Sequence, residues 1–156
     1  MSLTETFTYD PLTGLFTWAR PTRTALVGDP AGSVYPVGYV YLRFERKAYL
    51  AHRVAWLFML GEWPTHEIDH IDGVRTNNSW ANLREVTSRV NRENQRKAKS
   101  NNRSTGLLGA YPVGRRFKAV IEVHGRQIHL GMFATAEEAH IAYVTAKRNL
   151  HEGCTL

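Results

Sequence analysis

Apolar and polar side chains alternate with a period of two in several short stretches of the first fifty residues. FTYD and GLFTW flank Pro11–Gly14, a sequence typical of a tight turn. Residues 39–44 and 47–50 flank Glu45-Arg46, and the first of these two stretches shows the same alternation. We therefore predict two β-hairpins in this region.

A helical pattern of apolar residues follows from Ala51 to Leu60 and predicts a short buried helix. Downstream, the sequence favours a strand that ends near Asp69-His70, then a polar loop, then a second strand over residues 83–86. Thr87 or Ser88 is a suitable N-cap for a helix from about Arg89 to Lys97. This order of elements would bring His70 close to the first turn of that helix.

The polar stretch KSNNRSTG is the clearest break in composition along the chain. After it, the pattern predicts three short strands at 108–111, 117–123 and 127–133, and a helix that opens on a capping box, Thr135 to Glu138. We predict an α+β fold with two domains. Residues 1–99 form the first, with a β-rich N-terminal region, residues 100–105 are a linker, and residues 106–156 form the second.

The charge of the chain is unevenly distributed. Lys and Arg number 20 against 14 Asp and Glu, a formal net charge of +6. Most of the excess lies in one tract with seven basic residues and two glutamates, where the net charge is +5. Such a tract favours a polyanion partner, because neutralised phosphates release counterions; a solvated basic face is the alternative. Its basic residues are Arg84, Arg89, Arg92, Arg96, Lys97, Lys99 and Arg103.

Several classes of protein are excluded by what the sequence lacks. The single cysteine, Cys154, excludes an internal disulfide framework and a cysteine-rich zinc site. The first ten residues show neither the basic nor the apolar region of a secretory signal, and the longest apolar run, Val54–Leu60, is too short to span a bilayer. We therefore expect a soluble cytoplasmic protein without a membrane partner.

Four polar side chains with catalytic potential lie close together in the sequence: Asp69, His70, Asn82 and Asn91. Imidazole suits a general base near neutral pH, and carboxylate and amide oxygens suit a hard divalent cation. Asp69 and His70 point to opposite faces of a strand unless it bends, and the Asp-Gly pair at 72–73 favours a turn there. The amide of Asn82 can bond backbone groups and hold the loop. This set points to hydrolysis of a phosphodiester.

Residues 52–94 resemble the HNH (ββα-metal) endonucleases of phages and mobile introns, in the segments HRVAW, GEWP, EIDHIDG and NLREVT. The resemblance implies that His70 is the general base that activates water and that Asn82 is a structural asparagine of the loop. It also implies that Asp69 and Asn91 bind one divalent metal ion, Mg²⁺ or Mn²⁺. Asn77-Asn78 departs from the Asp-Asn or Asn-Arg pair of many relatives, which affects only details of the loop.

Residues 106–153 resemble the plant APETALA/ethylene-response-factor DNA-binding domain, through LGMF, TAEEA and a following Ala-Tyr. In that family a three-stranded sheet lies in the major groove and a helix supports it from behind. Many plant members have Trp where this chain has Phe117 and His129, so their base preference does not transfer. The DNA contacts implied by this resemblance are Arg115, Arg116, Lys118, Arg126 and His129.

The sequence thus predicts a metal-dependent HNH endonuclease, phage-encoded and homing-like, that cleaves or nicks double-stranded DNA as a monomer or homodimer in the host cytoplasm. The alternative is a DNA-binding regulator with an inactive nuclease fold; an RNA-binding protein would need aromatic motifs that this chain lacks. His66 has the spacing of a zinc pair with His70, but we expect it to be exposed or to pack. His52 is expected to be structural or to lie near the active site.

Overall fold

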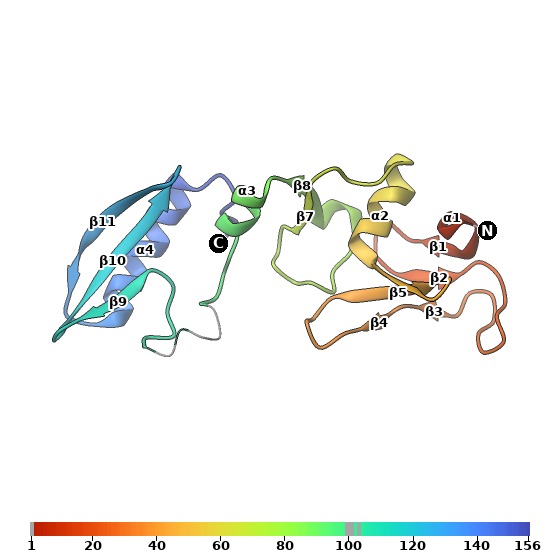
Figure 1. Cartoon of the computed structure of the whole chain (residues 1–156), viewed down its shortest axis with the longest axis horizontal. Coiled ribbons are helices and arrows are strands. Elements are labelled where there is room, and N and C mark those ends of the chain that lie inside the picture. The colour runs from red at the N-terminus through yellow and green to blue at the C-terminus, as the bar shows by residue number, and fades with distance from the viewer. Residues whose placement is uncertain (1, 99–101, 103) are drawn as a thin grey trace. The chain divides into compact units, whose positions relative to one another are not determined.

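The computed structural model describes residues 2–98, 102 and 104–156. These residues form several small antiparallel sheets and four α-helices, the mixed architecture that the sequence predicts (Figure 1). They divide into two units, Met1–Ser88 and Arg89–Leu156. The break predicted at 100–105 lies within the second unit and partly outside the described residues, so the assignment of domains stays a prediction.

The two predicted hairpins are present in the first unit. β1 (Phe7–Tyr9) pairs with β2 (Phe16–Trp18), and β5 (Val40–Phe44) pairs with β6 (Lys47–Leu50). Glu45 and Arg46 between β5 and β6 both have positive φ, as the central residues of a two-residue hairpin turn require. Three short elements were not predicted: α1 (Leu3–Thr6), β3 (Pro30–Ala31) and β4 (Ser33–Val34).

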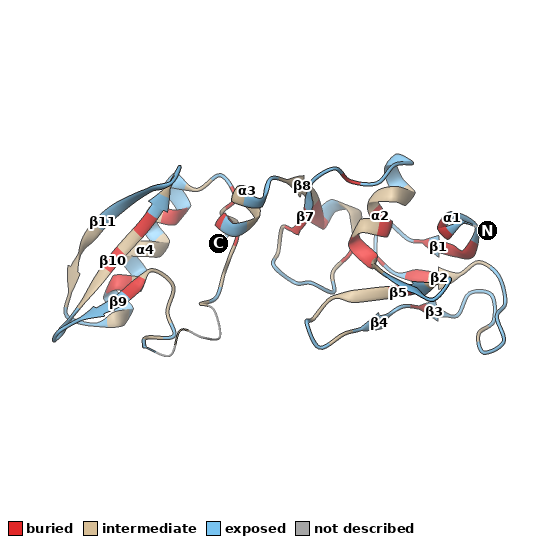
Figure 2. Cartoon of the chain, in the orientation of Figure 1, coloured by how far each residue is buried: buried red, intermediate tan, exposed pale blue. Residues whose placement is uncertain are grey.

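The predicted helix is α2 (Ala51–Leu60), which ends at Gly61 in the left-handed conformation. Its buried side faces the core of the first unit, as the red positions in Figure 2 show. Phe7, Leu42 and Val54 are fully buried there and join both hairpins to the helix in one core. This core supports β7 (Glu67–His70), which carries the predicted catalytic residues.

β7 pairs antiparallel with β8 (Leu83–Val86), and the single-turn helix η1 (Trp80–Asn82) precedes β8. The following helix, α3, spans Ser88–Glu93. The prediction of a helix as far as Lys97 was therefore wrong, and Arg96 and Lys97 lie beyond its end. The chain leaves the helix where the Gln95 carbonyl accepts a hydrogen bond from Lys147. Since the division between the units falls after Ser88, the packing of the ββα core stays a prediction.

The second unit contains the predicted three-stranded sheet and its helix. β10 (Arg116–Val123) lies between β9 (Ala110–Val113) and β11 (Arg126–Phe133), and α4 (Ala136–Leu150) opens on the predicted capping box. Ala110, Ala119 and Ala139 are buried between sheet and helix (Figure 2).

The start of β9 differs from the prediction. β9 begins at Ala110 because Gly109 turns the chain with positive φ, and a Cβ there would lie 2.0 Å from the Tyr143 ring. On α4, Leu150 is exposed, and Lys147 is the buried residue of the last turn.

Candidate active site

The register of β7 and β8 places Asp69 and His70 on opposite faces of a two-stranded ribbon. Asp69 lies opposite Arg84 and His70 lies opposite Leu83, and residues opposite each other share a face. Both predicted catalytic side chains are buried, at 6% and 4% exposure. The alternation of side chains along the strand therefore persists to its end, and the two side chains have different partners.

On one face, the Asp69 carboxylate is paired with Arg84. The Nε and Nη2 atoms of Arg84 donate to Asp69 Oδ2 at 3.0 and 2.8 Å. The guanidinium balances a carboxylate that would be costly to bury alone. A cation bound by Asp69 would share this carboxylate with Arg84, and an oxygen ligand of this kind fits Mg²⁺ or Mn²⁺.

On the other face, His70 is held by Asn78. His70 Nε2 lies 3.1 Å from Asn78 Oδ1, and Asn78 is 2% exposed. Because Asn78 Nδ2 donates to the Thr76 carbonyl at 3.4 Å, Oδ1 is the acceptor that faces His70. Nε2 therefore carries the proton, and Nδ1 is the basic nitrogen of the imidazole. From the sequence, we expected Asn78 to affect only details of the loop. The feature that could have identified it is the Asn77-Asn78 pair, in which Asn78 lies eight residues after His70.

Asn82 bonds across the loop, as its position in the sequence suggested. Its Oδ1 accepts from the backbone N–H of Asp72 at 2.9 Å, and its Nδ2 donates to Asp72 Oδ1 and to the Asn77 carbonyl at 2.9 and 2.8 Å. Asn77 Nδ2 also donates to Asp72 Oδ2 at 2.7 Å. These bonds connect the two ends of the loop.

The loop also rests on the first hairpin. The Tyr9 hydroxyl donates to the Asn78 carbonyl at 2.7 Å, and the Trp80 N–H donates to the Pro11 carbonyl at 2.8 Å. A Cβ on Gly14 would lie 2.2 Å from the Ser79 nitrogen, so only glycine permits this approach. The first hairpin thus positions the residue that holds His70.

Aromatic rings surround His70 on its buried side. The His52 ring lies edge-on at 5.1 Å between centroids, and the Tyr39 ring lies 6.0 Å away. The Arg75 guanidinium lies over the Tyr39 ring at 4.7 Å. We expected His52 either to be structural or to lie near the active site. The structure places it beside His70, the predicted base. His66, by contrast, is exposed and pairs with Glu85, so it is not part of this group.

The surroundings of the two buried histidines favour their neutral forms. Burial lowers the pKa of His70, although its hydrogen bond with Asn78 and the charges of Asp72 and Asp69 act in the opposite direction. Burial also lowers the pKa of His52 to about 3. A neutral imidazole at pH 7 can accept a proton, which is what the predicted role of His70 requires.

Asn91, the second predicted metal ligand, lies on α3 in the second unit, whereas Asp69 lies in the first. The joint metal site is therefore a prediction that rests on the chemistry of the two donors. Among the residues described, no three His, Cys, Asp or Glu side chains gather as a metal site.

The predicted basic tract is not a continuous solvent-exposed face. Arg84 pairs with Asp69, and Arg89 pairs with Glu93 and Glu152 at 2.8 Å each. Arg96 donates to the Thr155 carbonyl at 2.8 Å. Arg92 and Lys97 are exposed, and Lys99 and Arg103 lie outside the described residues. Part of the positive charge therefore stabilises the fold.

The sheet of the second unit has one face that α4 does not cover. By register, Lys118 shares this face with Tyr111 and Met132, and His129 shares it with Val120. Arg116 also belongs to this face and lies opposite Val113, while Arg115 lies in the preceding turn.

Arg126, the remaining predicted DNA contact on this sheet, has a different position. It lies opposite Val123, in the row that also contains the buried Ile121, so it points to the other face. The five predicted contacts of this sheet are thus not all on one surface.

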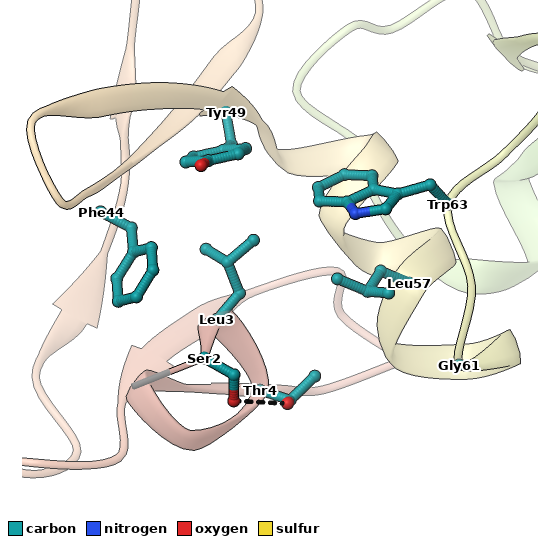
Figure 3. A pocket seen from close by; sticks show the side chains of 8 residues that line it. All are labelled: Ser2, Leu3, Thr4, Phe44, Tyr49, Leu57, Gly61 and Trp63. Carbon is teal, nitrogen blue, oxygen red and sulfur yellow. Dashed lines mark hydrogen bonds between the residues drawn. The ribbon is translucent and has the colours of Figure 1, made fainter.

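An apolar pocket lies elsewhere in the first unit, where the rings of Phe44, Tyr49 and Trp63 surround Leu3 (Figure 3). Its lining contains no carboxylate, imidazole or ammonium group and no residue of the group around His70. We therefore place the candidate active site at His70. The lining residues are Ser2, Leu3, Thr4, Phe44, Tyr49, Leu57, Gly61 and Trp63.

None of the helices in the described part of the chain is long and apolar enough to span a membrane. Comparison with curated proteins gives no match, and neither does comparison with solved structures. Comparison with family models matches residues 49–93 to the HNH endonuclease family. The matched segment begins in β6 and ends in α3, and it contains Asp69, His70, Asn78, Asn82 and Asn91. Residues 49–93 are thus similar to HNH endonucleases, and this similarity suggests a nuclease that acts on DNA.

Proposed function

We propose that this chain is a metal-dependent endonuclease that hydrolyses phosphodiester bonds of double-stranded DNA. The observation that carries the proposal is the buried His70, whose Nε2 lies 3.1 Å from Asn78 Oδ1 inside the segment matched to HNH endonucleases. Such an imidazole has a defined tautomer, and Nδ1 is its basic nitrogen, the one that takes a proton from water in the proposed reaction.

The proposed reaction is a single displacement at phosphorus. Nδ1 of His70 accepts a proton from a water molecule as the water oxygen bonds to phosphorus. The bond between phosphorus and the 3′ oxygen breaks, and the leaving 3′ oxygen takes a proton from solvent water, which gives a 5′-phosphate and a 3′-hydroxyl. Asp69 and Asn91 are the residues that would hold a divalent metal ion, which would neutralise charge at the phosphate. Asn82 acts at a distance by holding the loop that carries Asn78.

The test is cleavage of a supercoiled plasmid by wild type and by His70→Ala, with Mg²⁺ or Mn²⁺. We expect the variant to lose activity by about 10²–10⁴-fold, the usual contribution of a general base, and to keep its affinity for DNA. His66→Ala is the matched control, because His66 lies four residues away and is exposed. A wild-type chain that binds duplex DNA but cuts none with any divalent metal would support the alternative, a regulator with an inactive nuclease fold.

We also propose that the second unit binds duplex DNA through the open face of its sheet, with the exposed Arg92 and Lys97 as further phosphate contacts. Lys118 and Arg116 lie on that face with Tyr111, and basic side chains interleaved with an aromatic ring are typical of nucleic-acid contact; His129 also lies there. Lys118→Ala should reduce the slope of log Kd against log salt by about 1, as loss of one phosphate contact does. Arg126→Ala, on the other face, should change it less. If both variants change the salt dependence of DNA binding equally, the open face of the sheet is not the DNA-binding surface.

A phage origin, a homing-like role and a cytoplasmic location remain predictions from the sequence. So does the number of chains in the active form. End mapping of plasmid cleaved by the wild type would distinguish a nick from a double-strand break and reveal any site preference.

A further inference from the structure

The helix that carries the predicted metal ligand Asn91 is too short to be stable alone. α3 has six residues, whereas isolated helices need roughly 12–15 residues even to be marginal in water. Its helical conformation must therefore depend on contacts between α3 and other parts of the chain. Within the second unit, these contacts come from Glu152–Thr155, some sixty residues later in the chain.

The tightest of these contacts is made by Gly153. Its N–H donates to Glu93 Oε2 at 3.1 Å, and both residues are buried. A Cβ on Gly153 would lie 2.1 Å from the Val90 carbonyl oxygen and 2.9 Å from Glu93 Cβ. The backbone of Gly153 therefore packs directly against Val90 and Glu93 of α3, which lie on either side of Asn91 in the sequence. No side chain larger than hydrogen fits between them.

Further contacts hold the residues that follow α3. The Thr155 hydroxyl donates to Asn94 Oδ1 and accepts from Arg96, whose Nη2 also donates to the Thr155 carbonyl. Lys147, 1% exposed, donates to the Gln95 carbonyl. The end of α3 thus has buried polar partners, which favour one conformation because each would be costly to leave unpaired.

We propose that Glu152–Thr155 is a positioning segment for the metal site, because it fixes α3 and with it the side chain of Asn91. This inference rests on the proposed function, in which Asn91 is a metal ligand. The segment touches no reacting group in this scheme and acts only through α3. Residues that orient a metal ligand in this way typically affect metal affinity or activity by about 10–100-fold.

Two variants of the full chain test this. Thr155→Val removes the hydroxyl bonds to Asn94 and Arg96 and keeps the shape of the side chain. Gly153→Ala inserts a methyl group against α3 at a residue whose φ is not positive, so the clash is its main effect. Thr145→Val is the control, because the exposed Thr145 hydroxyl bonds only within α4.

The readouts are hydrogen exchange of the α3 amides and binding of Mn²⁺ alone, followed by electron paramagnetic resonance. We expect faster exchange in α3 and about tenfold weaker Mn²⁺ binding in both variants, with β10 still protected and Thr145→Val like wild type. Unchanged Mn²⁺ affinity in both variants overturns the proposal, as does loss of protection across β10, which means general unfolding. Failure of the proposed function is a separate result, absence of plasmid cleavage by a wild type that binds Mn²⁺.

Discussion

The loop after β7 and the helix α3 are both parts of the HNH segment, yet they are stabilised in different ways. The loop is held largely by neutral amide groups of its own, with Asn82 bonded to Asp72 and Asn77 within ten residues. α3 is held by residues sixty positions away, with charged partners at its exposed edge. The difference teaches that the two halves of a segment that is continuous in sequence can depend on different distant parts of the chain, the loop on the first hairpin and α3 on Glu152–Thr155.

Removal of the amide that holds the predicted base should have the largest effect. In Asn78→Ala, His70 Nε2 loses its acceptor, so the imidazole is free to change tautomer and orientation. We expect kcat for plasmid cleavage to fall by about 10²-fold with little change in KM, because misplacement of a reacting group acts on the chemical step. Asn78→Asp keeps an acceptor oxygen and should retain more activity. Wild-type kcat in Asn78→Ala would remove Asn78 from the proposed mechanism.

The first unit should lose stability when the Asn82 side chain, which connects the two ends of the loop, is removed. Asn82→Ala deletes three hydrogen bonds and leaves the half-buried Asp72 N–H and Asn77 carbonyl without that partner. We expect the free energy of unfolding to fall by about 2 kcal/mol, measured by urea denaturation. Asn149→Ala, at an exposed position of α4, is the control. A loss no larger than that of the control would show that the loop keeps its shape without Asn82.

Acid should destabilise the first unit through His52. Its pKa is about 3 when folded and 6.5 as a free side chain, so between these values the unfolded chain binds the extra proton and stability falls as the pH falls. Through His52, the free energy of unfolding should fall by at most about 1.4 kcal/mol for each pH unit below 6.5. Unfolding of wild type and His52→Phe between pH 7 and 5 measures it, since phenylalanine fills the site without titrating. Parallel pH profiles would show that His52 is already protonated or exposed.

The smallest effect is expected at the edge of α3. Glu152→Gln weakens the ion pair with Arg89, which is exposed on both sides and screened by water and salt. We expect no measurable change in the unfolding midpoint or in α3 exchange. If this variant loosens α3 as much as Thr155→Val does, then charge, and not the buried contacts, holds the helix.

The local elements of this chain could largely be predicted from its sequence. Ala51–Leu60 has a helical apolar pattern that ends at a glycine, and Glu45-Arg46 separates two alternating stretches, so each element is specified by residues within it. The end of α3 could not be predicted, because it depends on a bond from Lys147 to the Gln95 carbonyl. Lys147 itself has a charged side chain and gave no sign of being buried.

The candidate site shows the same limit. Asp69, His70 and Asn82 were identified by residue type and spacing, and Asn82 bonds as expected. Asn78 and Tyr39 were missed as neighbours of His70, because their positions depend on how the hairpins pack under the loop. Asp69 pairs with Arg84 because the register of β7 and β8 places them opposite each other. That register cannot be assigned from the sequence until the first and last residues of both strands are known.

The hydrogen bond from Tyr9 to the Asn78 carbonyl joins residues 69 positions apart. Contacts of such long range form late in folding, because the intervening chain must first lose its loop entropy. We therefore expect His70 to acquire its oriented imidazole late in the folding of the first unit. A chain trimmed at its N-terminus that keeps residues 49–93 but lacks the first hairpin would retain the matched segment without the contacts that position Asn78, and we expect it to lose the proposed activity.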